Sequence, residues 1–116
     1  MASHNELGRL GENMAKGFLE KKGFTIIELN WRHLLHEVDI VAMHQKMLIF
    51  IEVKTRSSLK YGFPDESIGI KKESMLKEAA EIYIEQKDLC YEIRFDIISI
   101  LKNEHEEKIY HIIDAF

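Results

Sequence analysis

The spacing of apolar residues divides the chain into two helical and five extended segments. Apolar side chains repeat every three to four residues over about 5–22, where Gly23 ends the pattern, and again from about 68 or 71 to 86. The buried stripe of the second helix is predicted to be Leu76, Ala79, Ala80, Tyr83 and Ile84. Runs of β-branched and aromatic residues predict strands over about 24–32, 37–44, 47–54, 91–101 and 108–113. The order αβββαββ predicts one layered α/β domain over residues 1–116.

In the second and third predicted strands, charged residues stand among apolar neighbours. If a turn at residues 45–46 joins these strands, Asp39 lies opposite Glu52. In the same register Glu37 lies opposite Lys54. Because side chains alternate along a strand and opposite residues share a face, these four side chains are expected to cluster on one face. The other face is expected to carry the core residues Val38, Ile40, Ala42, Ile49, Ile51 and Val53.

Facing carboxylates in a buried strand pair are costly unless a cation or a shared proton compensates them. Carboxylate oxygens suit a hard divalent cation such as Mg²⁺, which also keeps several waters. The alternative is a structural ion-pair cluster around Lys54, because buried ion pairs also occur without a function. Gln-Lys is not a favoured two-residue hairpin turn, and a slip of one residue would move the acids to opposite faces.

A stripe of small residues on the first helix, Gly8, Gly11 and Ala15, predicts close approach to a neighbouring element. Glu12 lies beside this stripe. It either leans toward the acidic cluster or is a solvated helix residue. His33 and His36 with Glu37 match no standard zinc spacing.

Basic residues follow the third strand closely. They form either a local basic rim or a set of scattered, solvated side chains. The residues are Arg56, Lys60, Lys71, Lys72 and Lys77.

Composition and charge narrow the class of protein. The 116 residues are 46% hydrophobic and 31% charged, as in ordinary soluble domains. The longest apolar run, 47–51, is far too short for a membrane span, and the N-terminus lacks a signal-peptide pattern. The single cysteine, Cys90, excludes an internal disulfide and fits a reducing, cytoplasmic location. The net charge of −4 argues against a protein that coats nucleic acid non-specifically.

An acid on the second strand and Glu-x-Lys on the third, in this element order, resemble the PD-(D/E)xK nuclease superfamily. Within it, the chain resembles the YraN-like family of small bacterial proteins regarded as endonucleases, which is related to archaeal Holliday junction resolvases. The resemblance covers nearly the whole chain. It rests on Asn5-Glu6-Leu7-Gly8, Gly11-Glu12, Asn30-Trp31-Arg32, Glu37-Val38-Asp39, Glu52-Val53-Lys54-Thr55-Arg56, Arg94-Phe95-Asp96 and Ala115-Phe116. His36 departs from it, because the family usually has Gly there.

The resemblance implies a restriction-endonuclease-like fold with a central mixed β-sheet flanked by helices. It also implies a metal centre for Mg²⁺ or Mn²⁺. Asp39 and Glu52 would bind the metal, with the Val53 carbonyl as a third ligand. Lys54 would orient the attacking water or help to deprotonate it. Glu12 matches an acid on the first helix of resolvase-like members and would be a metal ligand or support one.

Three further positions follow from the same resemblance. Glu37 would hold Lys54. Arg56 and Lys72 match positions expected near the phosphate of a bound nucleic acid.

Three functions follow from these residues. The first is a metal-dependent endonuclease that hydrolyses DNA phosphodiester bonds, on branched or damaged forms of DNA. The second is a catalytically weak nucleic-acid-binding protein of the same fold, and the third is a small-molecule metal phosphohydrolase or a structural adaptor. A homodimer is also expected, because resolvase-like relatives are often dimers and a duplex has two strands to cut. No membrane partner is expected.

Overall fold

The computed structural model describes residues 4–58 and 69–116, which form two helices and five strands in the predicted order. The elements are α1 His4–Lys21, β1 Thr25–His33, β2 His36–His44, β3 Met47–Arg56, α2 Gly69–Lys87, β4 Glu92–Lys102 and β5 Glu107–Ile112. Each bound lies within about two residues of its prediction. Most of the loop that follows β3, together with Lys60 of the predicted basic rim, lies outside the described residues. Neither helix in the described part of the chain is long and apolar enough to cross a membrane.

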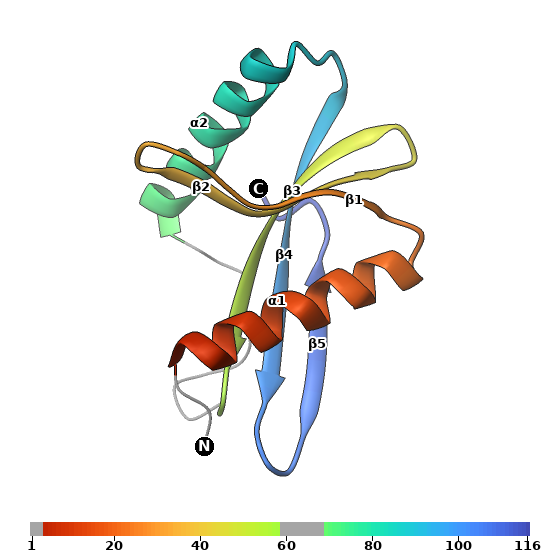
Figure 1. The fold of residues 1–116 in the computed structure, drawn as a ribbon, viewed down its shortest axis with the longest axis vertical. Helices are drawn as coiled ribbons and strands as arrows, with labels where there is room; N and C mark the ends of the chain where they lie inside the picture. The colour runs from red at the N-terminus through yellow and green to blue at the C-terminus, as the bar shows by residue number, and fades with distance from the viewer. Residues whose placement is uncertain (1–3, 59–68) are drawn as a thin grey trace.

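The five strands that the structure describes form one sheet in the order β1-β2-β3-β4-β5 (Figure 1). Of their ladders, β3–β4 alone is parallel, so the sheet is mixed as predicted. Parallel neighbours need a crossover connection. Here the connection between β3 and β4 contains α2. This topology places β3 at the centre of the sheet, between an antiparallel hairpin and a parallel partner.

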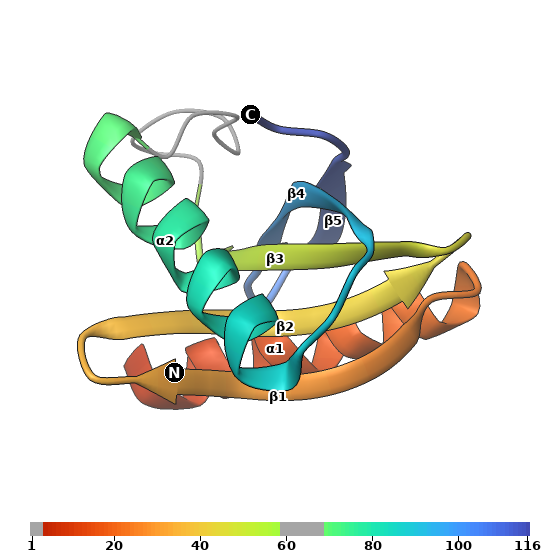
Figure 2. The ribbon, with the colours of Figure 1, turned by 90° about the horizontal axis from the view of Figure 1, so that it is seen from above.

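The two helices cover opposite faces of the sheet (Figure 2). On the α1 face, Ala15 and Leu19 pack with Ile40, Ala42 and other strand residues. On the α2 face the core contains four of the five residues predicted for the buried stripe: Leu76, Ala79, Ala80 and Tyr83. The fifth, Ile84, is partly buried against the same core. The sheet is therefore apolar on both sides, and its charged residues are exceptions that need partners.

The small-residue stripe on α1 is a contact surface. Ala15 is fully buried, and a Cβ added at Gly11 would overlap Oγ1 of Thr55 on β3. A Cβ at Gly8 would meet no atom within 4 Å. Gly11 therefore sets how closely the helix approaches the strand that carries Glu52 and Lys54. The helix ends at Lys21, and Gly23, whose φ of 93° is left-handed, follows as the predicted stop.

The β2–β3 hairpin has the predicted register. His44 pairs with Met47, and the ladder continues to Ile40 with Ile51. Both turn residues, Gln45 and Lys46, have left-handed φ values of 50° and 68°, as a two-residue hairpin turn of type I′ requires. The unfavourable residue types are therefore tolerated, and no slip occurs.

Beyond Ile40 and Ile51 the two strands separate. β3 continues to Arg56 against β4, whereas β2 stays paired with β1. Figure 1 shows the β1–β2 hairpin turning away from the far half of β3. We call the gap between residues 36–39 and 52–56 the fork.

The face assigned to Val38 from the sequence is wrong. Val38 was expected beside Ile40 and Ala42, but it packs in the α2-side core with Trp31 and Val41. Strict alternation breaks near Asn30, which has a left-handed φ of 52° and adjoins the paired residue Trp31. A left-handed residue rotates the strand locally, so the following residues change face.

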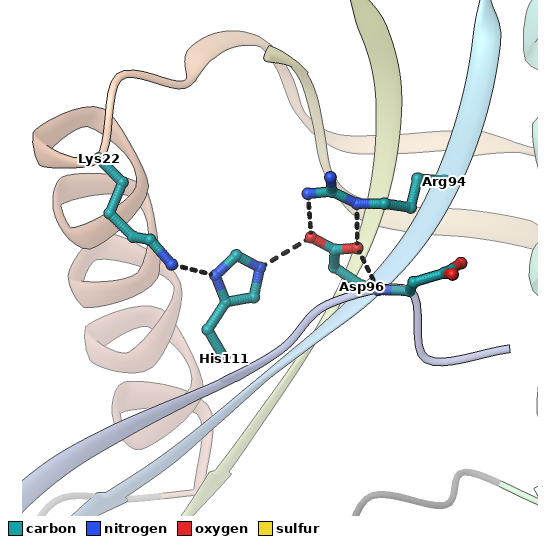
Figure 3. Close-up of polar contacts among 5 residues, drawn as sticks. Lys22, Arg94, Asp96 and His111 are labelled. Atoms are coloured by element: carbon teal, nitrogen blue, oxygen red, sulfur yellow. Dashed lines mark hydrogen bonds and ion pairs between the residues drawn. The ribbon is translucent and has the colours of Figure 1, made fainter. Parts of the chain in front are cut away.

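Arg94, Asp96 and the C-terminal segment form a buried polar cluster outside the fork (Figure 3). Arg94 donates two hydrogen bonds of 2.8 Å to the Asp96 carboxylate, and the Asp114 backbone N–H donates a third of 3.0 Å. His111 contacts the same carboxylate at 2.7 Å, and Lys22 contacts the other ring nitrogen at 2.7 Å. Because an ammonium group only donates, the Nδ1 atom of His111 accepts from Lys22 and its Nε2–H donates to Asp96.

Next to this cluster, the backbone N–H of Ala115 donates a 2.7 Å hydrogen bond to the Phe95 carbonyl, and Phe116 stacks on the Phe95 ring. The segment Arg94-Phe95-Asp96 therefore anchors the end of the chain.

Candidate metal centre

Asp39 lies in the fork, one residue beyond the last β2–β3 pair. Its Oδ2 accepts a 2.8 Å hydrogen bond from the backbone N–H of Val53. That N–H has lost its β2 partner because the strands separate here, and the carboxylate takes the partner's place. Asp39 thus supplies a polar group at the point where the backbone of β2 no longer pairs with β3.

Glu52 precedes Val53 on β3 and faces α2. It follows Leu48 and Phe50 at alternate positions, and both of these belong to the α2-side core. Its Oε1 lies 3.2 Å from the Nζ of Lys72, in the first turns of α2. The Glu52 side chain is only 12% exposed, whereas that of Lys72 is 43% exposed. A buried carboxylate is thus paired with a cation that solvent can reach.

Glu12 approaches the fork from α1. Together with Asp39, Val53, Thr55, Leu7 and Gly8 it lines a pocket of about 200 Å³. Its Oε1 atom is buried and has no hydrogen-bond partner among the described residues. A buried acceptor without a partner is costly, and such atoms commonly face a water or an ion. The alternative prediction, that Glu12 is a solvated helix residue, therefore does not apply to this buried oxygen.

The carboxyl groups of Glu12, Asp39 and Glu52 have raised pKa values. Burial raises the pKa of Glu52 to about 7, and the neighbouring Asp39 adds to the shift. Burial also raises the pKa of Asp39 against the opposing hydrogen bond from Val53, and burial with Asp39 raises that of Glu12. Burial disfavours the charged form of Lys72, but the charge and hydrogen bond of Glu52 outweigh it and raise the Lys72 pKa. Burial is the largest cause for all three carboxyls, so the fork disfavours their charged forms.

Asp39 and Glu52 lie close together, but not on one face of the sheet as the sequence predicted. Their side chains are close enough for a hydrogen bond between the two carboxyls. Asp39, however, lines the pocket on the α1 side, while Glu52 contacts α2. The two acids meet through the gap between the strands instead of lying side by side on one face, because the ladder ends just before them.

The remaining predicted residues lie along β3 and at its neighbours. Lys54 and Arg56 alternate with Val53 and share the face of Glu52; their parallel partners on β4 are Ser99 and Leu101. Both side chains are half-buried. Glu37, which was expected to hold Lys54, forms an exposed 3.2 Å ion pair with Arg32 on the adjacent strand β1.

The carboxylates of Asp39 and Glu52 are the kind of donor that a hard divalent cation prefers. Glu12 lies beside Asp39 at the pocket. Among residues 4–58 and 69–116, no group of three His, Cys, Asp or Glu side chains is placed to hold a metal by itself. Mg²⁺ needs only one or two carboxylates, because waters and phosphates complete its shell. The unpartnered oxygen of Glu12 and the adjoining pocket suit such an open site.

Two residues of this site had no predicted role. Asn30 donates a side-chain hydrogen bond to Glu12, and Thr55 lines the pocket and contacts Gly11. The sequence carries a weak signal for Asn30, since Asn is one of the few residues that readily adopt a left-handed φ. Thr55 carries no such signal, because a threonine in a strand is ordinary.

The histidines near the fork have other partners. His33 contacts Gln86, and His36 contacts Glu78, each at 3.0 Å. Their two side chains therefore lie against α2, and they add nothing to the pocket beside Asp39.

Comparison with known sequences identifies a family. The model of the uncharacterised protein family UPF0102 matches residues 11–100, a range that includes every acid of the fork. A UPF0102 protein of Flavobacterium psychrophilum is 45% identical over 116 residues, covering all of this chain and 98% of the relative. Relatives of the same name in Christiangramia forsetii and Bacteroides thetaiotaomicron are 47% and 40% identical over the full chain, covering 98% and 96% of their own lengths.

Proposed function

The chain belongs to the uncharacterised protein family UPF0102, and we propose that it is a metal-dependent endonuclease of the PD-(D/E)xK type that hydrolyses DNA phosphodiester bonds. The observation that carries the proposal is the fork. There, a break in the β2–β3 ladder allows Asp39 and Glu52 to meet, with Glu12 beside them. Lys54 follows Glu52 by two residues on the same face of β3.

The electrostatics of the fork support a role for a cation. Three carboxyls with raised pKa values share a small region, and Lys72 forms an ion pair with Glu52. A purely structural ion-pair cluster would be expected to satisfy its buried oxygens, yet Oε1 of Glu12 has no partner among the described residues. This orphaned oxygen favours the metal centre over the structural alternative.

The proposed chemistry divides between a metal and the chain. When bound by Asp39, Glu52 and the Val53 carbonyl, Mg²⁺ or Mn²⁺ would acidify a water and polarise the scissile phosphate. Lys54 would orient the nucleophilic water or take its proton. Arg56 and Lys72, on the α2 side of β3, would stabilise the negative phosphoryl oxygens. In this scheme Lys72 first neutralises Glu52 and then turns toward the phosphate.

The substrate class follows from charge placement. The chain is acidic overall, with a net charge of −4, which disfavours tight, non-specific coating of DNA. Lys54 and Arg56 nevertheless share the face of β3 on which Lys72 contacts Glu52. A short cationic track beside an acidic centre suits a protein that engages one phosphate region, such as a branch or a damaged site, instead of a long duplex.

A cleavage assay tests the proposal. The protein is incubated with linear, nicked and four-way DNA, with and without Mg²⁺ or Mn²⁺. We expect metal-dependent cutting that Asp39→Asn and Glu52→Gln each reduce about 10³-fold, because losing a metal ligand removes about 4 kcal/mol of transition-state stabilisation. The control is Glu85→Gln, which removes the charge of an exposed α2 glutamate away from the fork.

The other functions predict different results. Gel-shift binding of DNA without any cutting would support the catalytically weak nucleic-acid-binding protein. If the protein neither cuts nor binds DNA, a small-molecule phosphohydrolase or an adaptor becomes the better description. Cutting that survives in both acid variants would contradict the proposed centre.

A further inference from the structure

Two leucines at the tip of the β1–β2 hairpin are almost fully exposed. Leu34 is 90% and Leu35 is 86% exposed, well above the other exposed large hydrophobic residues of the described chain. They form the two-residue turn between His33 and His36, which pair directly. Figure 2 shows this tip at the outer end of the hairpin, to one side of α1 and α2. Scattered apolar residues on a surface are normal, but an adjacent pair presented at a tip is not.

The backbone of this turn is also unfavourable for its residues. Leu34 has a φ of 56°, in the left-handed region, which costs a residue with a Cβ about 1 kcal/mol. A hairpin turn with positive φ at its first central residue normally has glycine there. The chain therefore retains a strained, water-exposed apolar pair where Gly followed by a polar residue would be more stable. Strain of this kind is a common mark of a functional segment.

The base of the tip is held firmly. His36 contacts Glu78 and His33 contacts Gln86, each at 3.0 Å, so both flanking residues are tied to α2. The His33 ring also stacks with Trp31, whose side chain is buried. Both residues that flank the tip thus contact α2, and the exposed leucines lie beyond these contacts.

The tip is close to the fork along β2. Leu35 precedes Asp39 by four residues, which corresponds to about 13 Å of extended chain. Bases along one DNA strand are about 3.4 Å apart, so the tip would lie about four nucleotides from a phosphate at the acids. Arg32, whose side chain is 73% exposed, adjoins the tip and forms a surface ion pair with Glu37. Such pairs are weak, so its guanidinium group can turn to a phosphate.

We propose that Leu34 and Leu35 form a wedge that inserts between bases of the DNA held at the fork and so directs cleavage to branched or distorted DNA. This inference rests on the proposed nuclease function and adds the kind of DNA that the site selects. Apolar side chains, leucine among them, unstack base steps in this way, and the cost is lowest where stacking is already interrupted. The two leucines thus make a branch point the preferred substrate.

A protein partner is a poorer fit to the same tip. A stable interface buries about 800 Å² on each partner, far more than two side chains can supply. The tip is also convex and narrow, whereas protein contacts of that size need a broad, complementary surface. DNA bases need only a projection that can enter between them.

The test uses a double variant that removes the wedge without harming the turn. Leu34→Gly with Leu35→Ser suits a turn with positive φ at its first residue, so we expect the fold to be at least as stable as the wild type. Cleavage of linear DNA should be unchanged. Cleavage of four-way DNA relative to linear DNA should fall about tenfold, corresponding to about 1.4 kcal/mol. The matched control changes the other hairpin turn, Gln45→Asn with Lys46→Gly.

A second readout follows the bases directly. Four-way DNA carrying 2-aminopurine near the branch is bound in Ca²⁺ in place of Mg²⁺. Wild-type protein should increase the fluorescence of the unstacked base, whereas the Leu34→Gly, Leu35→Ser variant should not.

The outcomes separate the two ideas. If the wild type neither cuts nor binds any DNA, the proposed function and the wedge both fail. If it cuts but the double variant keeps the same preference and fluorescence, only the wedge fails. A change of oligomeric state in the double variant, measured by light scattering, would instead identify the leucines as a protein contact and overturn the wedge.

Discussion

Asp96 is fully buried, and its ionised form is stabilised by the fold. Burial would raise its pKa, but hydrogen bonds from His111, Arg94 and the Asp114 backbone outweigh burial and lower the pKa to about 2. A depressed pKa means that the contribution to stability is present above the ordinary value of 3.8 and is lost as the pH falls toward 2. We expect about 2 to 3 kcal/mol of unfolding free energy to disappear between about pH 4 and pH 2, measured by urea denaturation.

The substitution Asp96→Asn tests the same contribution at neutral pH. It leaves the Arg94 guanidinium, whose side chain is only 14% exposed, without its carboxylate. We expect a loss of about 3 kcal/mol at pH 7, because removing one partner of a buried ion pair strands the other. Asp88→Asn, at an exposed residue with a left-handed φ, is the control and should change stability by less than about 0.5 kcal/mol. A variant that kept the wild-type pH profile would exclude Asp96 as its source.

At the scale of single residues, the sequence predicted which acids converge but not what they contact. Asp39 and Glu52 could be placed near each other because hairpin register is a property of the chain. Their positions on different sides of the sheet could not be predicted, because the ladder ends just before them. The Lys72 contact with Glu52 could not be predicted, since it depends on how α2 is rotated and displaced on the sheet. The orphaned Glu12 oxygen likewise depends on the depth of α1, which periodicity does not measure.

At the scale of elements, the position of α1 is controlled by one glycine. Gly11→Ala would force the new Cβ against Thr55, so α1 must move away from β3. Overpacking costs about 1–3 kcal/mol, partly offset by about 1 kcal/mol from better helix propensity. Gly8→Ala has open space and should stabilise the protein by about 0.5–1 kcal/mol. Thermal melts should therefore shift in opposite directions, and equal shifts would show that α1 packs less closely than described.

The β2–β3 turn permits a second prediction at this scale. Gln45 and Lys46 both have left-handed φ values, which Asn and Gly adopt at lower cost. The double substitution Gln45→Asn, Lys46→Gly should raise the unfolding free energy by about 1–2 kcal/mol without changing the register. Chemical denaturation measures the gain, and unchanged metal-dependent cleavage would show that the fork is intact. Destabilisation would mean that the two native side chains make contacts beyond the turn.

Elements and register were predictable where local chemistry determines them. The end of α1 before Gly23, the buried stripe of α2 and the β2–β3 pairing each depend on residues within a few positions of one another. The separation of β2 from β3 does not depend on nearby residues alone. It arises where β2 stays paired with β1 while β3 stays paired with β4. Val38 was placed on the wrong face because the left-handed backbone at Asn30 breaks the simple alternation of faces along the strands.

At the scale of the whole molecule, the acids of the fork lie where β2 and β3 separate, in a sheet that the two helices cover on both faces. α1 lies on one face and α2 on the other, and each contributes a charged residue to the fork (Figure 2). The centre therefore depends on three layers at once, which explains why no single segment contains it. The mixed sheet was expected from the family resemblance, and the connection through α2 explains why the adjacent strands β3 and β4 are parallel.

A ligand that binds only the folded fork should stabilise the entire domain. At 100 times its dissociation constant, Mg²⁺ should add about 2.7 kcal/mol to the unfolding free energy, which corresponds to a melting shift of about 10 °C for a domain of this size. The shift should vanish in Asp39→Asn, because the metal would lose a carboxylate from the fork, and should persist in Glu85→Gln. Since this measurement needs no DNA and no catalysis, it tests the metal centre separately from the nuclease activity. An equal shift in Asp39→Asn would place the bound cation elsewhere on the protein.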